Sequence, residues 1–389
     1  METRTKDKII KNFEKRFLLV RKNYIVKRIN LTGKTYGHKK YLVKKTTDTV
    51  SVIANKSHAL DIRSYLTLVV PRGFHAHLVK CDFFYLIRGD EKEALNVIKR
   101  KGCGTTIVIR NRFAKKRFER FLVGYNEEKD ELYYGFYNIA SLQRLRHYEL
   151  LLKLIYGRAI RKKLYEVFYP NKYLVQLKKT LKKCREAQKI IIGYKENIKS
   201  VLRKNCKKIP CVDIEDDYFS LSYYQNKKLL ITGHAFGWMM KEILSLIIQQ
   251  TKIKQLFYIG NCGALKYFKI GEIIYPNCLF YSKRGKQIIN NILAPKNYGL
   301  VNHLSVPTPL IETNDFIAKN FNRFSTVDVE LFDIVKETMK VTKKMAVGIV
   351  LVVSDRPGKE ENSALVSDER RFQRSLSYCV ERVVNMALQ

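Results

Sequence analysis

The chain has 389 residues, enough for two ordinary domains, and 46% of them are hydrophobic, with 24 Tyr and 20 Phe. This apolar and aromatic content excludes general disorder. The purely apolar runs stay far below the ~20 residues of a membrane span, the first ten residues hold no apolar signal region, and the eight cysteines form no CxxC pair. We therefore expect a soluble cytoplasmic protein with reduced thiols, no membrane contact, no bound metal and no cofactor.

Positive charge is concentrated in the amino-terminal half. Residues 1–190 hold 45 Lys and Arg against 17 Asp and Glu, a net charge of +28 out of the chain's +38. Such an asymmetry indicates a polyanionic partner such as nucleic acid. The alternative is genome composition, because an AT-rich genome enriches Lys together with Ile, Asn and Tyr without any function. Both interpretations stay open.

Residues 1–143 are predicted to form a basic α+β domain of unknown fold. Strand-like texture lies between residues 39 and 86, and a helix is expected at 91–100. The run Arg110–Arg120 interleaves basic residues with Phe113 and Phe118, which suits nucleic-acid binding but also suits an amphipathic helix with a solvated face. Residues 144–188 are expected to form a basic helical linker.

From Lys189 onward strands and helices alternate, which is typical of an α/β sheet domain at residues 189–389. The expected strands lie at 190–193, 218–224, 228–232 and 255–259. One helix is expected at 196–204, and a second is expected to begin at the glycine loop 233–237 and to end at about residue 250. Two loops at strand ends contain glycines, Gly233–Gly237 and Gly260–Leu265. Glycine lets a backbone approach a ligand closely, although it also makes tight turns where no ligand binds.

Two carboxylates follow in the last third of the chain. Glu330 ends the sequence Val327-Asp328-Val329-Glu330 at the start of an expected helix, and Asp355 follows the apolar run Ala346–Val353 and Ser354. Ligands of open α/β sheets bind beyond the carboxyl ends of the strands, so the two acids could converge on one ligand. Alternatively, Glu330 faces solvent and Asp355 caps a turn.

Taken in order, four segments resemble the nucleoside phosphorylase/nucleosidase superfamily, which includes purine nucleoside and uridine phosphorylases and the methylthioadenosine/S-adenosylhomocysteine nucleosidases. They are the strand Lys189–Gly193, the loop Gly233–Gly237, the loop Gly260–Leu265 followed by Ile270–Ile273, and Val327–Glu330 followed by Ser354-Asp355. The resemblance covers residues 187–389. It implies a three-layer α/β/α domain around a central mixed sheet, a nucleoside bound at the carboxyl edge of the sheet, and a homo-oligomer.

The resemblance also implies roles for individual residues. Glu330 matches the carboxylate that binds the ribose hydroxyls, with Val329 beneath the sugar, and Asp355 matches the general acid near the purine N7. Residues 305–313 fall in the region that contacts the base. Further substrate contacts are implied for Gly233, Gly260, Asn261, Cys262, Gly263 and Ser354.

Departures from the family pattern bear mainly on the nucleophile. Many bacterial phosphorylases carry a basic phosphate ligand just before the glycine loop, where this sequence has Tyr258-Ile259, and Asn261 replaces the usual Ser or Thr. Nucleosidases use a glutamate about five residues after the first strand to activate water. Glu196 lies three residues after Gly193, two residues before that position, and is the candidate base. Leu331-Phe332 stands where small residues normally pack, so this pair could narrow the sugar pocket or remodel an interface.

These observations predict cleavage of the N-glycosidic bond of a purine nucleoside or a related nucleotide. A buried carboxylic acid that donates to the purine assists departure of the base, and a carboxylate on the sugar diol binds more strongly as positive charge develops. The co-substrate is water in a nucleosidase, which we favour, or phosphate in a phosphorylase. One alternative is a non-catalytic nucleoside or nucleotide sensor whose basic amino-terminal half binds nucleic acid. Another is a glycosidase that this half delivers to RNA or DNA.

Overall fold

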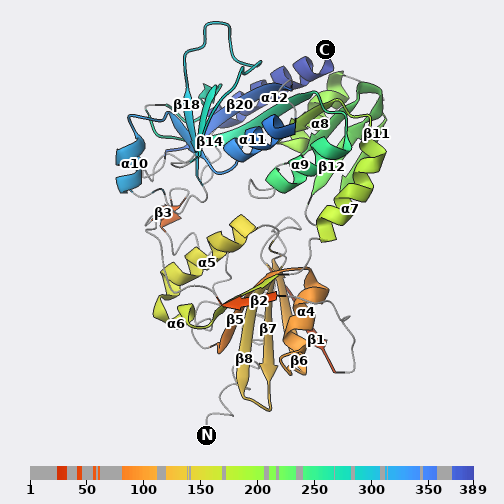
Figure 1. The fold of residues 1–389 in the computed structure, drawn as a ribbon, viewed down its shortest axis with the longest axis vertical. Coiled ribbons are helices and arrows are strands. Elements are labelled where there is room, and N and C mark those ends of the chain that lie inside the picture. Colours follow the sequence, from red (N-terminus) through yellow and green to blue (C-terminus); the bar gives the residue numbers. More distant parts are fainter. Residues whose placement is uncertain are drawn as a thin grey trace. The chain divides into compact units, whose positions relative to one another are not determined.

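The chain folds into two compact units (Figure 1), the first made of Met1–Val52 and Ile62–Asn171 and the second of Ile53–Asp61 and Lys172–Gln389. The computed structural model describes residues 24–32, 42–45, 56–57, 60–61, 81–111, 120–137, 139, 142–168, 172–205, 210–215, 219–233, 240–266, 268–281, 285–306, 312, 314–341, 345–356 and 370–389. Most of the strand-like texture expected before residue 81, and residues 112–119 of the basic run, lie outside this described part.

The first unit is built on a seven-stranded mixed sheet in the order β1-β6-β7-β8-β5-β9-β2. Its neighbouring strands are antiparallel except at β5, which runs parallel to both β8 and β9. The strands are β1 (Tyr24–Asn30), β2 (Leu42–Lys45), β5 (Phe83–Arg88), β6 (Thr105–Asn111), β7 (Arg120–Asn126), β8 (Glu131–Tyr137) and β9 (Leu164–Phe168).

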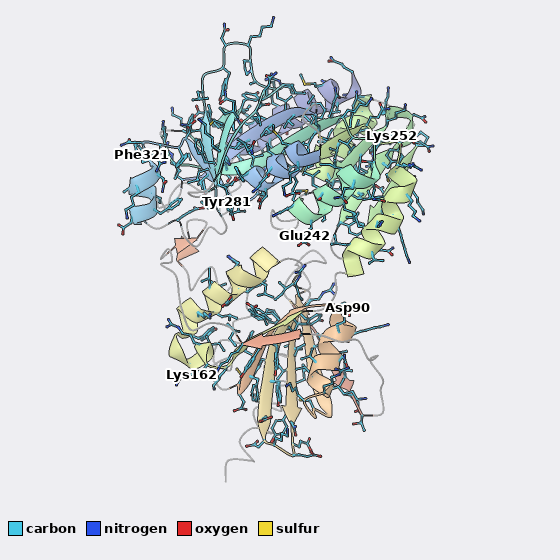
Figure 2. All side chains as sticks on the ribbon, in the orientation of Figure 1. Asp90, Lys162, Glu242, Lys252, Tyr281 and Phe321 are labelled. Carbon is cyan, nitrogen blue, oxygen red and sulfur yellow. The ribbon has the colours of Figure 1, made fainter. Side chains whose placement is uncertain are left out.

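Helix α4 (Glu91–Lys99) covers one face of this sheet and lies where the sequence predicts a helix. Asp90, labelled in Figure 2, begins the helix as its N-cap: its carboxylate accepts a hydrogen bond from the Glu93 amide at 2.9 Å. The Glu93 carboxylate in turn accepts one from the Asp90 amide at 3.0 Å, which completes a capping box. Val97 and Ile98 bury the apolar side of α4 in the core.

Residues 144–188, expected to be a linker, are divided between the two units. Helices α5 (Leu142–Tyr156) and α6 (Arg158–Arg161) belong with β9 to the first unit, whereas α7 (Lys172–Leu181) and the 3-10 turn η1 (Lys182–Cys184) belong to the second. Both long helices carry buried leucines: Leu145, Leu151 and Leu152 in α5, and Leu177 and Leu181 in α7. An apolar helix face needs a partner to cover it, so this basic stretch is absorbed into the folded units.

The second unit contains an eleven-stranded sheet in the order β11-β12-β13-β10-β14-β19-β18-β16-β17, with β20 on the other edge of β14 and β15 beside β20. The four strands β13, β10, β14 and β20 are mutually parallel, and β19 is antiparallel to β14. The strands are β10 (Lys189–Ile192), β11 (Cys211–Glu215), β12 (Ser220–Tyr224), β13 (Leu229–Thr232), β14 (Gln255–Ala264), β15 (Ile273–Ile274), β16 (Cys278–Tyr281), β17 (Gly285–Ile288), β18 (Asn302–Ser305), β19 (Thr326–Asp328) and β20 (Ala346–Asp355). A separate pair, β3 (Lys56–Ser57) and β4 (Leu60–Asp61), also belongs to this unit.

Helices cover both faces of the second sheet (Figure 1). On one face, α8 (Lys195–Asn205) and α12 (Arg370–Leu388) bury Ile198 and Val380 against alternate strand residues such as Ile191, Phe257 and Val350. On the other, α7, α9 (Met240–Gln250) and α11 (Leu331–Val341) pack on one another, and the short α10 (Asn314–Asn320) lies further along the chain. The three-layer α/β/α arrangement around a mixed central sheet, predicted from the sequence, is confirmed.

Strand β14 differs from expectation in length. The sequence predicts a strand that ends at Ile259 and a glycine loop from Gly260 to Leu265, but the strand continues to Ala264. Its outer half pairs with β20 on one edge and, at Gly263 and Ala264, with β19 on the other. Neighbouring strands supply the hydrogen bonds that keep this glycine-bearing stretch extended, although glycine itself has low strand preference.

No helix among the described residues is long and apolar enough to cross a membrane. Seven cysteines are described, and each is a free thiol: Cys81, Cys103, Cys184, Cys211, Cys262, Cys278 and Cys379.

Candidate active site

One edge of β14 changes partner halfway along the strand. β10 pairs with this edge only as far as Ile192, opposite Tyr258, and β19 pairs with it from Gly263, opposite Val327. Within the described part of the chain, no strand pairs with the edge at Ile259–Cys262, while β20 follows the opposite edge throughout. A break of this kind at the carboxyl ends of parallel strands is where open α/β sheets bind ligands.

Two acidic segments flank the end of β14. Gly263 lies opposite Val327 on one side and opposite Asp355 on the other, and Asp328 directly follows Val327. The Cys262 thiol is close to both acids: burial, followed by the negative charges of Asp328 and Asp355, raises the pKa of this thiol well above its usual 9.0. The strand register thus brings both carboxylate-bearing segments to one end of β14.

Glu330 lies two residues beyond β19 and points back along β14. Its Oε1 accepts a hydrogen bond from the Tyr258 hydroxyl at 2.9 Å. The pKa of Glu330 is raised from 4.5 to about 8: burial raises it most, the negative charge of Asp328 also raises it, and the Tyr258 hydrogen bond partly offsets them. Glu330 as a whole residue is half-buried.

Asp328 fixes the segment that carries Glu330. Its Oδ2 accepts a hydrogen bond from the Leu331 amide at 2.9 Å and so caps α11, while its Oδ1 accepts one from the Ser305 hydroxyl at 2.5 Å. His303 Nε2 lies 2.9 Å from the same Oδ1, and His303 Nδ1 lies 2.8 Å from Thr326 Oγ1. The set contains Ser, His and Asp, but the Ser305 hydroxyl donates to Asp328 and not to His303, so we assign it a structural role and not that of a nucleophilic triad.

Asp355 is the last residue of β20 and is buried. Its Oδ1 accepts a hydrogen bond from the neighbouring Ser354 hydroxyl at 2.7 Å, and the same hydroxyl lies 3.4 Å from the Cys262 carbonyl oxygen on β14. Ser354 therefore orients the Asp355 carboxylate relative to the strand end.

Two tyrosine side chains contact residues of the unpaired stretch Ile259–Cys262 of β14. Tyr194 follows β10, and its hydroxyl donates a short hydrogen bond to the Asn261 side-chain oxygen. The Tyr258 ring lies over Gly260. Burial raises the pKa of Tyr194 and of Tyr258, and the charge of Glu330 raises both further. Both phenols are therefore proton donors at neutral pH.

Glu312 is a fourth acid near this strand end and was not singled out from the sequence. The side chain is half-buried; burial, then the negative charges of Asp355 and Asp328, raise the pKa of Glu312 well above its usual 4.5. Its position within residues 305–313, the segment matched to the base-contacting region, was the available signal. A single glutamate in a segment without periodicity gives no sequence-level reason to prefer it.

The remaining candidate residues are placed as follows. Val329 is half-buried and packs with the small cluster around Val327 and Leu304. Gly233 follows β13, and the rest of its expected loop lies outside the described residues. Glu196, the candidate base, is in the first turn of α8 with an exposed side chain, whereas Tyr194 just before it faces Asn261.

The Leu331-Phe332 pair is buried inside the second unit. The Phe332 ring stacks on Tyr281, labelled in Figure 2, with ring centroids 5.4 Å apart. It also fills the space beside Gly285, where an added Cβ would lie 2.5 Å from the Phe332 ring. The bulky residue thus packs against the β16–β17 hairpin.

No protein-family model matches the chain, and no curated protein matches its sequence. Among solved structures, the purine nucleoside phosphorylase of Toxoplasma gondii in complex with immucillin-H is 15% identical, with 53% of this chain and 92% of that chain covered and a TM-score of 0.40. The methylthioadenosine/S-adenosylhomocysteine nucleosidase of Neisseria meningitidis in complex with methylthio-immucillin-A is 13% identical (52% and 97% covered, TM-score 0.39). A putative methylthioadenosine nucleosidase of Weissella paramesenteroides is 13% identical (51% and 98% covered, TM-score 0.39).

These solved structures belong to the same superfamily that the sequence resembles. At such identities and TM-scores the likeness concerns the chain fold alone, and no activity of those enzymes transfers to this chain through it.

Proposed function

We propose that the second unit cleaves the N-glycosidic bond of a purine nucleoside or a related nucleotide, with water as the nucleophile. The observation that carries the proposal is the register at the end of β14, where Gly263 lies between Val327 and Asp355. This register brings the Glu330 segment and Asp355 to the two sides of one strand end, beside the stretch of β14 that lacks a strand partner among those described.

The two acids have different surroundings, which suits different roles. Glu330 is half-buried and accepts a phenol hydrogen bond, and its ionised carboxylate can bind the sugar hydroxyls and stabilise the positive charge that develops on the sugar. Asp355 is buried and its carboxyl is oriented by Ser354, and the resemblance matches it to the general acid that donates a proton to the departing purine. The base leaves with the bonding electron pair, and water adds to the sugar carbon and loses a proton.

The charges at the site favour water over phosphate. Tyr258 stands where the resemblance places a basic phosphate ligand, and its neutral phenol donates to Glu330. The negative charge of Asp328 lies close to Glu330 at the same strand end, and it repels an incoming phosphate. Phosphate remains the alternative co-substrate.

The deciding experiment incubates the purified chain with adenosine, inosine, guanosine, methylthioadenosine, S-adenosylhomocysteine and AMP, with and without phosphate, and separates the products by chromatography. Free base without phosphate is expected. Base release that requires phosphate would replace hydrolysis by phosphorolysis. Absence of release in both conditions would contradict the proposal.

The group that activates water is tested separately with Glu196→Gln. The resemblance proposes Glu196 as this group. Its side chain is exposed, so a direct role in activating water requires the first turn of α8 to move. A fall in kcat of roughly a hundredfold would support Glu196 as the base. An unchanged kcat would exclude it.

A second candidate function is a non-catalytic nucleoside sensor with a nucleic-acid-binding amino-terminal half. The exposed Glu196 carboxylate favours it, because this candidate base does not share the buried surroundings of Glu330 and Asp355. Nucleosides that raise the melting temperature without being consumed would support the sensor and contradict hydrolysis.

A further inference from the structure

We propose that Tyr258 is a positioning residue for Glu330, seated by Gly260, and that it fixes the carboxylate that binds the sugar hydroxyls. This inference rests on the proposed function and adds to it a residue that the resemblance does not supply, since the family position is basic.

Gly260 makes room for the Tyr258 ring. The two residues lie on the same face of β14, because side chains two apart in a strand point the same way. An added Cβ at Gly260 would lie 2.4 Å from Tyr258 Cε1 and 2.6 Å from its hydroxyl oxygen. Gly260 is not among the described glycines with positive φ, so the backbone accepts any residue there and only the ring requires glycine.

The seated ring carries its hydroxyl to Glu330. Tyr258 is fully buried and is held between Ile192 on β10 and Ile349 on β20, both in the parallel core of the sheet. Its hydroxyl donates to Glu330 Oε1 at 2.9 Å. The donor is thus attached to a position of β14 that is paired on both edges, whereas Glu330 follows the three-residue β19.

Electrostatics makes this hydrogen bond consequential. Burial and the charge of Asp328 both disfavour the ionised form of Glu330, and the Tyr258 hydrogen bond favours it. The phenol keeps its proton because burial raises its own pKa well above 10. A hydrogen bond to a charged group is among the stronger ones in proteins. Tyr258 therefore both orients the Glu330 carboxylate and favours the ionised form that binds a sugar diol.

Any pH effect at Glu330 also depends on the titratable groups that face it from neighbouring elements. Asp328 lies on its own segment, Tyr258 on β14, and Tyr194, after β10, is close enough for the charge of Glu330 to raise its pKa. The Tyr258 hydroxyl donates directly to Glu330 Oε1. Removing this hydroxyl should therefore raise the pKa of Glu330 while the ring continues to fill the core.

The test uses Tyr258→Phe in the full chain. Carbon-13 labelling of glutamate carboxyls and NMR titration, with Glu330→Gln to assign the resonance, reports the titration midpoint of Glu330 without any substrate. We expect the midpoint to rise by at least one pH unit and the KM for the cleaved nucleoside to rise roughly tenfold to a hundredfold, with a smaller change in kcat.

The matched control is Tyr275→Phe. Tyr275 is another largely buried tyrosine of this unit, whose hydroxyl accepts a hydrogen bond from Arg382 at 2.7 Å. This variant should lower the melting temperature somewhat but leave the Glu330 midpoint and KM unchanged. An unchanged midpoint in Tyr258→Phe would overturn the inference. If the wild type neither binds nor cleaves nucleosides, the proposed function fails, while the titration still decides whether Tyr258 holds Glu330.

A double-mutant cycle tests the role of Gly260. Gly260→Ala should displace the ring and shift the Glu330 midpoint in the same direction as Tyr258→Phe. In a Tyr258→Ala background the clashing ring atoms are gone, so the added Cβ should cost little. Equal costs of Gly260→Ala in both backgrounds would show that Gly260 does not serve Tyr258.

Discussion

Asp355 and Gly263 are partners in the parallel pairing of β20 and β14, and the same Gly263 pairs with Val327 of β19. Two segments far apart in the sequence therefore present their acids at one strand end. The register of β14 against β20 shifts between Cys262 and Gly263, so the pairing is irregular at the end of β14. A local irregularity of this kind redirects side chains at the end of a pairing.

Asp355→Asn should abolish release of the base. The amide has the same shape and can still accept a hydrogen bond from Ser354, but it cannot transfer a proton to the purine. We expect kcat to fall by roughly a hundredfold to ten-thousandfold, measured by chromatography of the free base, with little change in melting temperature.

Ser354→Ala is the matched control, because it removes only the hydroxyl that orients Asp355 across 2.7 Å. It should reduce kcat by roughly tenfold or less. Base release by Asp355→Asn at the wild-type rate would remove Asp355 from the mechanism.

Asp328→Ala should act on stability. Its carboxylate caps α11 and accepts a hydrogen bond from the buried Ser305 hydroxyl in β18, so its loss leaves the Leu331 amide and Ser305 without this acceptor. We expect the free energy of unfolding to fall by about 2–4 kcal/mol in urea denaturation.

Asp315→Ala provides the comparison, since Asp315 is exposed in the first turn of α10 and its loss should change stability by less than about 0.5 kcal/mol. A stable Asp328→Ala protein that no longer binds nucleosides would assign Asp328, and not its neighbour Glu330, to the ligand.

The parallel core could be predicted from the sequence because its strands are buried on both faces. Such strands appear as continuous apolar runs, as in Ile190–Ile192 and Ala346–Val353, and both runs form strands. The outer half of β14 could not be predicted, because glycines at 260 and 263 indicate a loop. Their extended form depends on β19 and β20, which come more than sixty residues later in the chain.

The side-chain partnerships of the site lie beyond sequence reasoning for a similar reason. Tyr258 is 72 residues from Glu330 in the sequence. The sequence shows only that a tyrosine stands where a basic residue was expected, and it does not indicate that the phenol contacts Glu330. The Asp328 network joins β18 to β19 through strand register, which no local pattern specifies. Residues 144–188 were predicted to be a linker because they are strongly basic. Two helices in this stretch nevertheless bury leucines, and the basic composition does not indicate this.

The positive charge of residues 1–190 should be measurable as salt-dependent binding. We expect the full chain to bind a fluorescent oligonucleotide at 50 mM salt and to lose affinity steeply by 200 mM, as counterion release requires. A Lys115/Lys116/Arg117→Ser triple variant should reduce the slope of log affinity against log salt by about one for each lost phosphate contact. A Lys204/Lys241/Lys254→Ser variant, with equal charge removed from exposed positions after residue 190, should leave it unchanged. No binding at low salt would attribute the charge to composition.

Glu330→Gln should stabilise the protein at alkaline pH while it removes nucleoside binding. Burial and Asp328 raise the pKa of Glu330 from 4.5 to about 8, so the folded state retains a proton that the unfolded state loses. The wild-type free energy of unfolding should therefore be highest, as far as Glu330 is concerned, below pH 4.5 and should decline as the pH rises to about 8. The uncharged glutamine removes this decline, and urea denaturation at pH 9 should show a gain of about 1–2 kcal/mol that is absent at pH 4.5.

Nucleoside affinity should depend on pH in the opposite sense. The sugar diol binds the ionised carboxylate, so calorimetric titration of the wild type should show affinity that increases as the pH passes through about 8, where Glu330 loses its proton. Glu330→Gln should bind weakly at every pH. A wild-type affinity that stays constant between pH 6 and pH 9 would mean that Glu330 does not contact the sugar, even if the stability difference is observed.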